Sequence, residues 1–170
     1  MIRPFIKWPG GKSRVLPDLL PYLPKGDRLI EPFVGGASVF LNTDYRHYVL
    51  ADINADLIWL YQTATNRTKE LIHIADEMFR DGNSAQAYEE YRSRFNSSQG
   101  HFNVRRAALF LYLNRHGFNG MCRYNARGGF NVPYGRYEKP YFPETEIKLF
   151  AEKAKDTNAI FFVMSFDLLL

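Results

Sequence analysis

The feature that most constrains this sequence is a strand, a glycine turn, a short helix and a second strand near its N-terminus. Residues 28–33 form a compact apolar run, which we expect to be a buried strand. A Gly-Gly pair and a short helix over 37–41 follow, and residues 47–51 form a second strand that ends at Asp52. This order opens a βαβ unit, so it predicts a parallel sheet with helices on its faces.

The glycine pair Gly35-Gly36 is a candidate ligand-binding turn. Glycines after a strand let the backbone approach a ligand, and the N-terminus of the following helix favours negative groups. Asp52 lies 17 residues after Gly35, close to the roughly 20-residue offset at which an acid reaches a nucleoside ribose. A plain tight turn is the alternative interpretation. The ligand need not be a dinucleotide, because methyl-donor sites use the same sheet edge and the same ribose acid.

A second glycine pair, in Gly10-Gly11-Lys12-Ser13, imitates a phosphate-binding loop. A full Walker motif requires a further glycine where this chain has Ile6, and no strand precedes the pair. Trp8 and Lys12 are better interpreted together, since an indole stacks on a purine and an ammonium reaches a carboxylate. A surface arm without a ligand is the alternative.

The remaining pattern is mainly helical until the chain returns to a sheet. Residues 13–23 indicate a short helix, and Asn54 is a suitable cap for the first helix after Asp52. Residues 115–141 break the helical pattern with glycines and alternating aromatics, which predicts a hairpin and extended loops. The longer helices are expected over 54–65, 69–79, 84–95, 104–114 and 144–155, and a last strand over 159–164.

Positive charge is concentrated in residues 105–139. Seven cations and one anion give this segment a net charge of +6, so the rest of the chain carries −2 within a total of +4. Such a concentration indicates a polyanionic partner, although a generic basic surface has the same signature.

Residues 114–125 interleave arginine, asparagine and aromatic side chains within this basic segment. Arginine reads guanine through two hydrogen bonds and asparagine reads adenine in the same way. A Phe or Met at a loop tip suits insertion into a base step, while Arg127, Arg136 and backbone amides suit phosphates. A solvent-exposed glycine-rich loop is the alternative.

Several classes are disfavoured by composition. The single cysteine, Cys122, excludes an internal disulfide and a cysteine-rich metal site, and the four histidines lack ligand spacing. No run of 18 apolar residues exists, and residues 1–12 lack the apolar centre of a signal peptide. We therefore expect a cytoplasmic, monomeric protein with no metal and no membrane contact.

Six segments together resemble the Dam family of DNA adenine-N6 methyltransferases, which orders its motifs as cofactor loop, target-recognition region and catalytic tetrapeptide. The matching segments are residues 5–12, 31–38, 51–54, 110–125, 131–137 and 139–143. The resemblance implies that Trp8, Lys12 and Asp52 bind S-adenosylmethionine and that Phe33 and Gly35 line the same pocket. It also implies transfer of a methyl group to adenine N6 in double-stranded DNA.

The same resemblance implies DNA-binding roles. Lys7 and Arg123 read bases of a short palindrome, which in this family is typically GATC. Phe118 and Asn119 lie where the family inserts a side chain and holds the base orphaned by flipping. Many members carry Tyr in place of Phe118, so a hydroxyl contact is lost while stacking is kept. By the same resemblance, Met121 and Pro133 make apolar contacts with bases. The residues that contact phosphates are Arg92, Asn125 and Arg136.

One family motif is missing. Methylating an exocyclic amine requires the adenine to leave the helix stack and acceptors to hold its amino group. The family supplies these with an Asp-Pro-Pro-Tyr turn, whereas none of the nine prolines here is adjacent to another. We therefore expect a chain truncated before the catalytic motif, with no catalytic residues of its own and little or no methyl transfer alone.

The predicted fold is α/β: a Rossmann-like methyltransferase sheet, incomplete at the C-terminus, with a mainly helical target-recognition insertion. Residues 1–55 and 140–170 are expected to form the partial core, and 56–139 the DNA-binding region. Two rival hypotheses remain. One is a non-catalytic DNA-binding remnant, and the other is an unstable fragment with an unpaired sheet edge and uncovered apolar surface.

Overall fold

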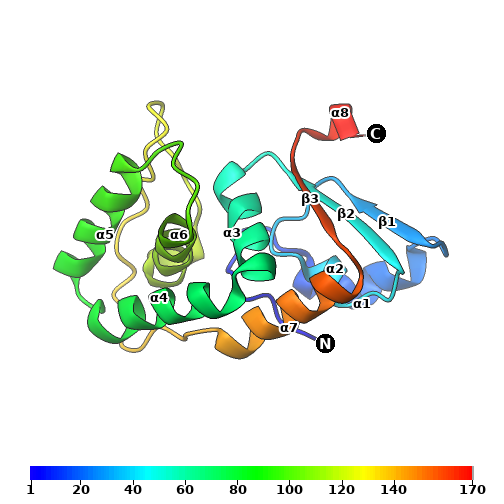
Figure 1. Cartoon of the computed structure of the whole chain (residues 1–170), viewed down its shortest axis with the longest axis horizontal. Helices are drawn as coiled ribbons and strands as arrows, with labels where there is room; N and C mark the ends of the chain where they lie inside the picture. The colour runs from blue at the N-terminus through cyan, green and yellow to red at the C-terminus, as the bar shows by residue number, and fades with distance from the viewer. Residues whose placement is uncertain (170) are drawn as a thin grey trace.

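The computed structural model describes residues 1–169, in which three strands form one parallel sheet (Figure 1). β1 (Arg28–Glu31), β2 (His47–Asp52) and β3 (Ile160–Val163) lie in that spatial order, and both neighbouring pairs are parallel. β3 pairs with β2 although most of the helices lie between them in the sequence. The predicted α/β class and parallel sheet are confirmed.

Short turns surround the first strands. The helix predicted over 13–23 is divided into η1 (Lys12–Arg14), α1 (Leu16–Leu19) and η2 (Leu20–Tyr22). Pro17 and Pro21 each lie in the first turn of their element, where the missing N–H is tolerated but a preceding helix cannot continue. α2 (Ser38–Leu41) connects β1 to β2 as predicted.

The long helices match their predicted positions within a few residues. Asn54 caps the first of them, since its side chain accepts a hydrogen bond from the Leu57 amide at 3.0 Å. Residues 115–141 form isolated antiparallel bridges, Tyr124 with Phe130 and Gly117 with Tyr134, in place of regular hairpin strands. The remaining elements are α3 (Ala55–Asn66), α4 (Thr68–Asp81), α5 (Ala85–Ser97), α6 (Val104–His116), η3 (Phe118–Gly120), α7 (Glu144–Asp156) and α8 (Phe166–Leu169).

One face of the sheet packs on an aromatic cluster. Phe161 of β3 lies 6.0 Å between ring centroids from Phe150 of α7 and 6.1 Å from Tyr61 of α3. Tyr48 of β2 meets Phe40 of α2 edge to face at 4.8 Å. These contacts attach α2, α3 and α7 to the same side of the sheet and fix where its strands end.

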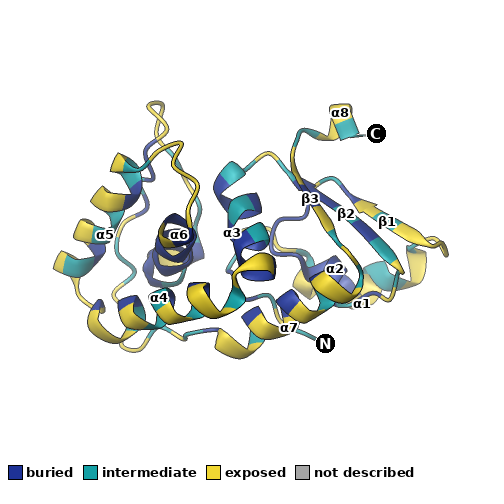
Figure 2. Cartoon of the chain, viewed as in Figure 1, coloured by how far each residue is buried: buried dark blue, intermediate teal, exposed yellow. Residues whose placement is uncertain are grey.

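The other face of the sheet is exposed, which corrects two predictions. Side chains alternate along a strand, and Ile30, Ile160 and Phe162 point away from the aromatic cluster with 43%, 51% and 39% of their surface exposed. Figure 2 shows β1 and β3 largely in the exposed colour. The predicted strand is confirmed over 28–31, but its predicted burial is wrong except at Glu31, and the described helices cover one face only.

α6 lies at the centre of the helical part, packed against α3, α4 and α5. Its predicted apolar stripe is confirmed as buried at 104, 107, 108, 110, 111 and 113. Arg106 and Asn114 of α6 are polar and also buried. Arg106 forms hydrogen bonds to the end of α5, and Asn114 forms them to the N-terminal arm and to Gly120. No helix among residues 1–169 has the length and apolarity needed to span a membrane.

Candidate functional site

A cavity of about 270 Å³ opens where β1 and β2 end, between the N-terminal arm and the turn at Gly35-Gly36. Parallel strands present their carboxyl ends at one edge of the sheet, which is where ligands bind in open α/β folds. The cavity is lined by all five residues predicted to contact the cofactor: Trp8, Lys12, Phe33, Gly35 and Asp52.

Trp8 forms one wall of this cavity by packing directly against the glycine turn. A Cβ atom added to Gly35 would lie 2.9 Å from Cδ1 of the Trp8 indole, and the φ angle of Gly35 is +46°. Only glycine combines this left-handed backbone with so close an approach. Phe33 adds a second aromatic ring, with 59% of its surface exposed.

Asp52 is held rigidly at the end of β2. Its Oδ2 accepts a hydrogen bond from the Gly35 amide at 3.0 Å, and its Oδ1 accepts one from the Asn54 amide at 3.0 Å. Each carboxylate oxygen keeps a lone pair for a further donor such as a ribose hydroxyl. The Gly35 amide is thereby occupied, so this turn does not offer it to a phosphate.

Lys12 lies on the opposite wall beside a buried acid. Its Nζ donates to Oε1 of Glu31 at 3.0 Å and to the carbonyl oxygen of Phe33, which leaves one N–H for a ligand. Burial raises the pKa of Glu31, and the Lys12 ammonium partly offsets that rise. Oε2 of Glu31 is buried and has no partner among the described residues.

A wider hollow of about 770 Å³ lies elsewhere, between the start of α4 and α7. Its lining mixes cations with anions, among them Lys69, Glu70, Lys148 and Glu152. None of the predicted site residues lines it, so we assign it no ligand. Residues 1–169 contain no group of three or more His, Cys, Asp or Glu side chains placed to hold a metal ion.

Most of the predicted DNA-reading residues lie on the surface of the loop after α6. Lys7 and Met121 are half-buried beside it, and Nζ of Lys7 lies 4.2 Å from the ring centroid of Tyr137. Asn119 adopts a left-handed φ of +52°, and its amide donates to the Tyr137 hydroxyl at 3.0 Å. The exposed members of the predicted set are Phe118, Asn119, Arg123, Asn125, Pro133 and Arg136.

Three predicted DNA contacts use their side chains in internal hydrogen bonds. Arg123 donates from Nε to Oδ1 of Asn131 at 2.8 Å and from Nη2 to the Asn131 carbonyl at 3.0 Å. Oδ1 of Asn125 accepts from the Arg127 and Gly129 amides and closes the hairpin turn. Arg92 of α5 donates to the Val132 carbonyl at 3.1 Å and forms an ion pair with Glu89, so it connects the loop to α5.

Asn114 joins the cavity at the carboxyl edge of the sheet to the loop after α6. Its Oδ1 accepts from the Lys7 amide at 2.8 Å, while its Nδ2 donates to the carbonyls of Lys7 at 2.7 Å and Gly120 at 3.2 Å. Lys7 precedes Trp8 in the same arm, so one buried amide holds a cavity wall and a loop residue in fixed relation.

A sequence profile of the D12 class of N6 adenine-specific DNA methyltransferases matches residues 8–170. The DNA adenine methylase of Escherichia coli (strain K12) is 57% identical over 165 residues, that of Salmonella typhi 55% over 165, and that of Vibrio cholerae 49% over 159. The chain belongs to the D12 class N6 adenine-specific DNA methyltransferase family.

The match covers most of this chain but only part of each relative. Aligned residues make up 96% of this chain and 58% of the Escherichia coli and Salmonella proteins, and 93% and 57% for Vibrio cholerae. The resemblance to the Dam family is confirmed, and the chain spans under three-fifths of the length of these relatives.

Sequence patterns alone do not single out two residues that the structure brings to the cavity and the loop. Glu31 is the one acid in the predicted apolar run over 28–33, a signal that could have marked it. Asn114 lies within the matching segment 110–125, but its partner Lys7 is 107 positions away in the sequence. No local pattern predicts such a contact.

Proposed function

We propose that this chain carries the S-adenosylmethionine site and the DNA-reading surface of an adenine-N6 methyltransferase acting on double-stranded GATC. The observation that carries this proposal is the convergence of Trp8, Lys12, Phe33, Gly35 and Asp52 on one cavity at the carboxyl edge of the sheet. The parallel order of the three strands supports a Rossmann-like core, which we propose for residues 1–55 and 140–170.

The donor set of the cavity suits S-adenosylmethionine. Trp8 and Phe33 offer aromatic faces to a purine, Asp52 offers carboxylate oxygens to a ribose diol, and Lys12 keeps one N–H for a carboxylate. Glu31 adds negative charge beside Lys12, which favours a cationic ligand. When bound, S-adenosylmethionine supplies an electrophilic methyl group on its sulfonium.

The surface of residues 56–139 suits duplex DNA. Lys7 and Arg123 are proposed to read guanine edges, with Met121 and Pro133 making apolar base contacts. Phe118 and Asn119 are proposed to fill the space that a flipped adenine vacates. The residues proposed to contact phosphates are Arg92, Asn125 and Arg136. To do so, Arg92 must first break its hydrogen bond to the Val132 carbonyl or its ion pair with Glu89.

We assign binding roles to the residues of this chain and place none of them in the chemical step. No Asp-Pro-Pro-Tyr occurs in the sequence. The residues present hold the methyl donor, orient the duplex and keep the two sites in fixed relation through Asn114. We place the protein in the cytoplasm, acting as a monomer on DNA.

Calorimetric titration tests this assignment. S-adenosylmethionine should bind the unmodified chain, and Asp52→Ala should weaken that binding by about tenfold or more, since each hydrogen bond to a charged group contributes about 1.5–3 kcal/mol. Affinity for a GATC duplex should survive this change. DNA binding with no cofactor binding by the unmodified chain would support a non-catalytic DNA-binding remnant instead.

A further inference from the structure

The residue next to Arg123 is tied to α3 by a nearly buried acid. The Tyr124 hydroxyl donates to Oδ2 of Asp56 at 2.8 Å, across 68 positions in the sequence. Burial is the main cause that raises the pKa of Tyr124, so its hydroxyl stays protonated and remains a donor. Asp56 thus holds the hairpin at Tyr124, the residue adjacent to Arg123, which we propose reads guanine.

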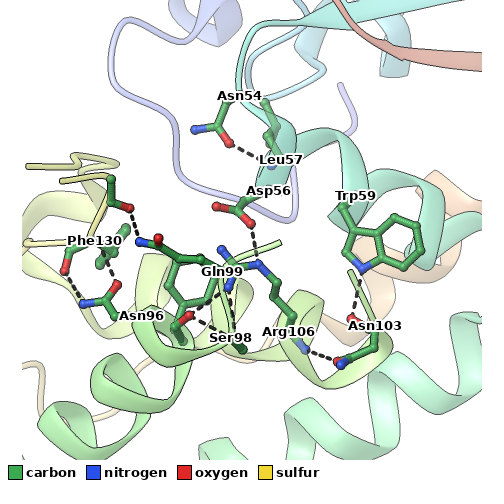
Figure 3. A network of polar contacts seen from close by, with 12 residues as sticks. Asn54, Asp56, Leu57, Trp59, Asn96, Ser98, Gln99, Asn103, Arg106 and Phe130 are labelled. Atoms are coloured by element: carbon green, nitrogen blue, oxygen red, sulfur yellow. Dashed lines mark hydrogen bonds and ion pairs between the residues drawn. The ribbon is translucent and has the colours of Figure 1, made fainter. Parts of the chain in front are cut away.

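Asp56 is itself fixed by a buried ion pair (Figure 3). Arg106 of α6 donates from Nε to Oδ1 of Asp56 at 2.8 Å, and side-chain exposures are 5% for Arg106 and 11% for Asp56. Nη1 of Arg106 donates to the Phe95 carbonyl at 2.7 Å, and the guanidinium lies 4.0 Å from the Phe95 ring centroid. With both oxygens engaged, the carboxylate has one orientation.

The far side of the hairpin is held by α5. Asn96 accepts from the Phe130 amide at 2.8 Å and donates to the Phe130 carbonyl at 3.1 Å (Figure 3). Gln99 donates to the Gly128 carbonyl at 2.8 Å. Tyr124 and Phe130 pair with each other, so both ends of the hairpin rest on helices while its tip stays exposed.

This frame determines where Arg123 points. Neighbouring residues of an extended segment face opposite sides, so an inward Tyr124 gives an outward Arg123, which is exposed. Asn131 engages Nε and Nη2 of the guanidinium. Three N–H groups, two on Nη1 and one on Nη2, have no partner among residues 1–169, and one from each nitrogen gives a pair of donors suited to one guanine edge.

We propose that Asp56, acting through Tyr124, is a positioning residue that aims Arg123 at guanine and so determines specificity. The inference rests on the proposed DNA-reading function and adds residues to it. If the Arg123 side chain is already held in its bound orientation, less conformational entropy is lost when the chain binds the correct DNA sequence. Asp56 lies in the first turn of α3, four residues after Asp52, so the residue that positions Arg123 and the acid proposed to bind the ribose belong to one stretch of backbone.

The test compares two palindromic duplexes, one with GATC and one with AATT, by fluorescence anisotropy at one salt concentration. Tyr124→Phe keeps the ring and removes the hydrogen bond to Asp56. It should narrow the ratio of the two dissociation constants by about three- to tenfold, mainly through weaker GATC binding. Asn131→Ala should narrow it too. Tyr45→Phe, which removes a hydroxyl bonded to the Pro24 carbonyl, should leave the ratio unchanged.

An Arg123→Ala background separates aiming from general support. If Tyr124 acts through Arg123, adding Tyr124→Phe there should not change the ratio further. An unchanged ratio in Tyr124→Phe, or an equal narrowing with and without Arg123, would overturn the proposal while leaving DNA reading intact. Equal binding of the two duplexes by the unmodified chain would overturn the GATC-reading function and this inference with it.

Discussion

At the scale of single residues, the shape of the proposed cofactor cavity depends on how closely Trp8 approaches Gly35. Gly35→Ala places a methyl group 2.9 Å from the indole and keeps an unfavourable φ of +46°. We expect a loss of about 1–3 kcal/mol in the free energy of unfolding and weaker S-adenosylmethionine binding, because the indole must move.

Gly100→Ala is the matched control for that change. Gly100 has a φ of +75° but no atom within 4 Å of its would-be Cβ, so it carries backbone strain without a clash. Urea unfolding and calorimetry of both variants separate the two effects. Equal cofactor affinity in the two variants would show that the Trp8–Gly35 contact does not shape the site.

His116 provides a prediction about pH. Burial lowers the pKa of His116 to about 4 from 6.5, and its ring lies between Phe79 and Tyr112. The unfolded chain therefore takes up this proton first as pH falls, so stability is complete above pH 6.5 and decreases from there toward pH 4.

The size of that effect follows from linkage. Between pH 7 and pH 5 this histidine should remove about 2 kcal/mol from the free energy of unfolding. His116→Gln, which has no titrating ring, should lose less over the same interval in urea unfolding at both pH values. A pH dependence identical to that of the unmodified chain would contradict a neutral, buried His116.

At the scale of elements, α3 and α6 are joined by the Asp56–Arg106 pair. Arg106→Met leaves a nearly buried carboxylate without its charged partner, so we expect a loss of about 3–5 kcal/mol in the free energy of unfolding. Arg105 is exposed and provides the control, since Arg105→Met should change the free energy of unfolding by no more than about 0.5 kcal/mol. Similar urea midpoints for the two variants would argue against a structural role for the pair.

The elements also show what sequence could and could not predict. The Asn54 cap and the buried stripe of α6 were predictable, because capping and helical periodicity are local. The exposed face of β1 was not, because burial depends on what covers a strand rather than on its own apolarity. Asp56 and Arg106 are 50 residues apart, and which buried ions pair is decided by packing.

At the scale of the whole molecule, the N-terminal arm and Asn114 connect the cavity at the carboxyl edge of the sheet, our proposed cofactor site, to the loop after α6, our proposed DNA-reading surface. Phe33, Gly35 and Asp52 lie together because parallel strands of a βαβ unit end at one edge of the sheet, whereas Trp8 and Lys12 reach this edge from the N-terminal arm. The uncovered sheet face, with Ile30, Ile160 and Phe162, has no counterpart in those motifs.

The two tryptophans of the chain allow the central claim to be tested directly. Trp8 lines the cavity, whereas Trp59 on α3 donates to the Asn103 carbonyl and lies outside it. In Trp59→Phe, S-adenosylmethionine should change the remaining indole fluorescence in a saturable way. In Trp8→Phe, the signal from Trp59 should stay constant over the same titration. No saturable change in Trp59→Phe, or the same change in both variants, would contradict a cofactor site at Trp8.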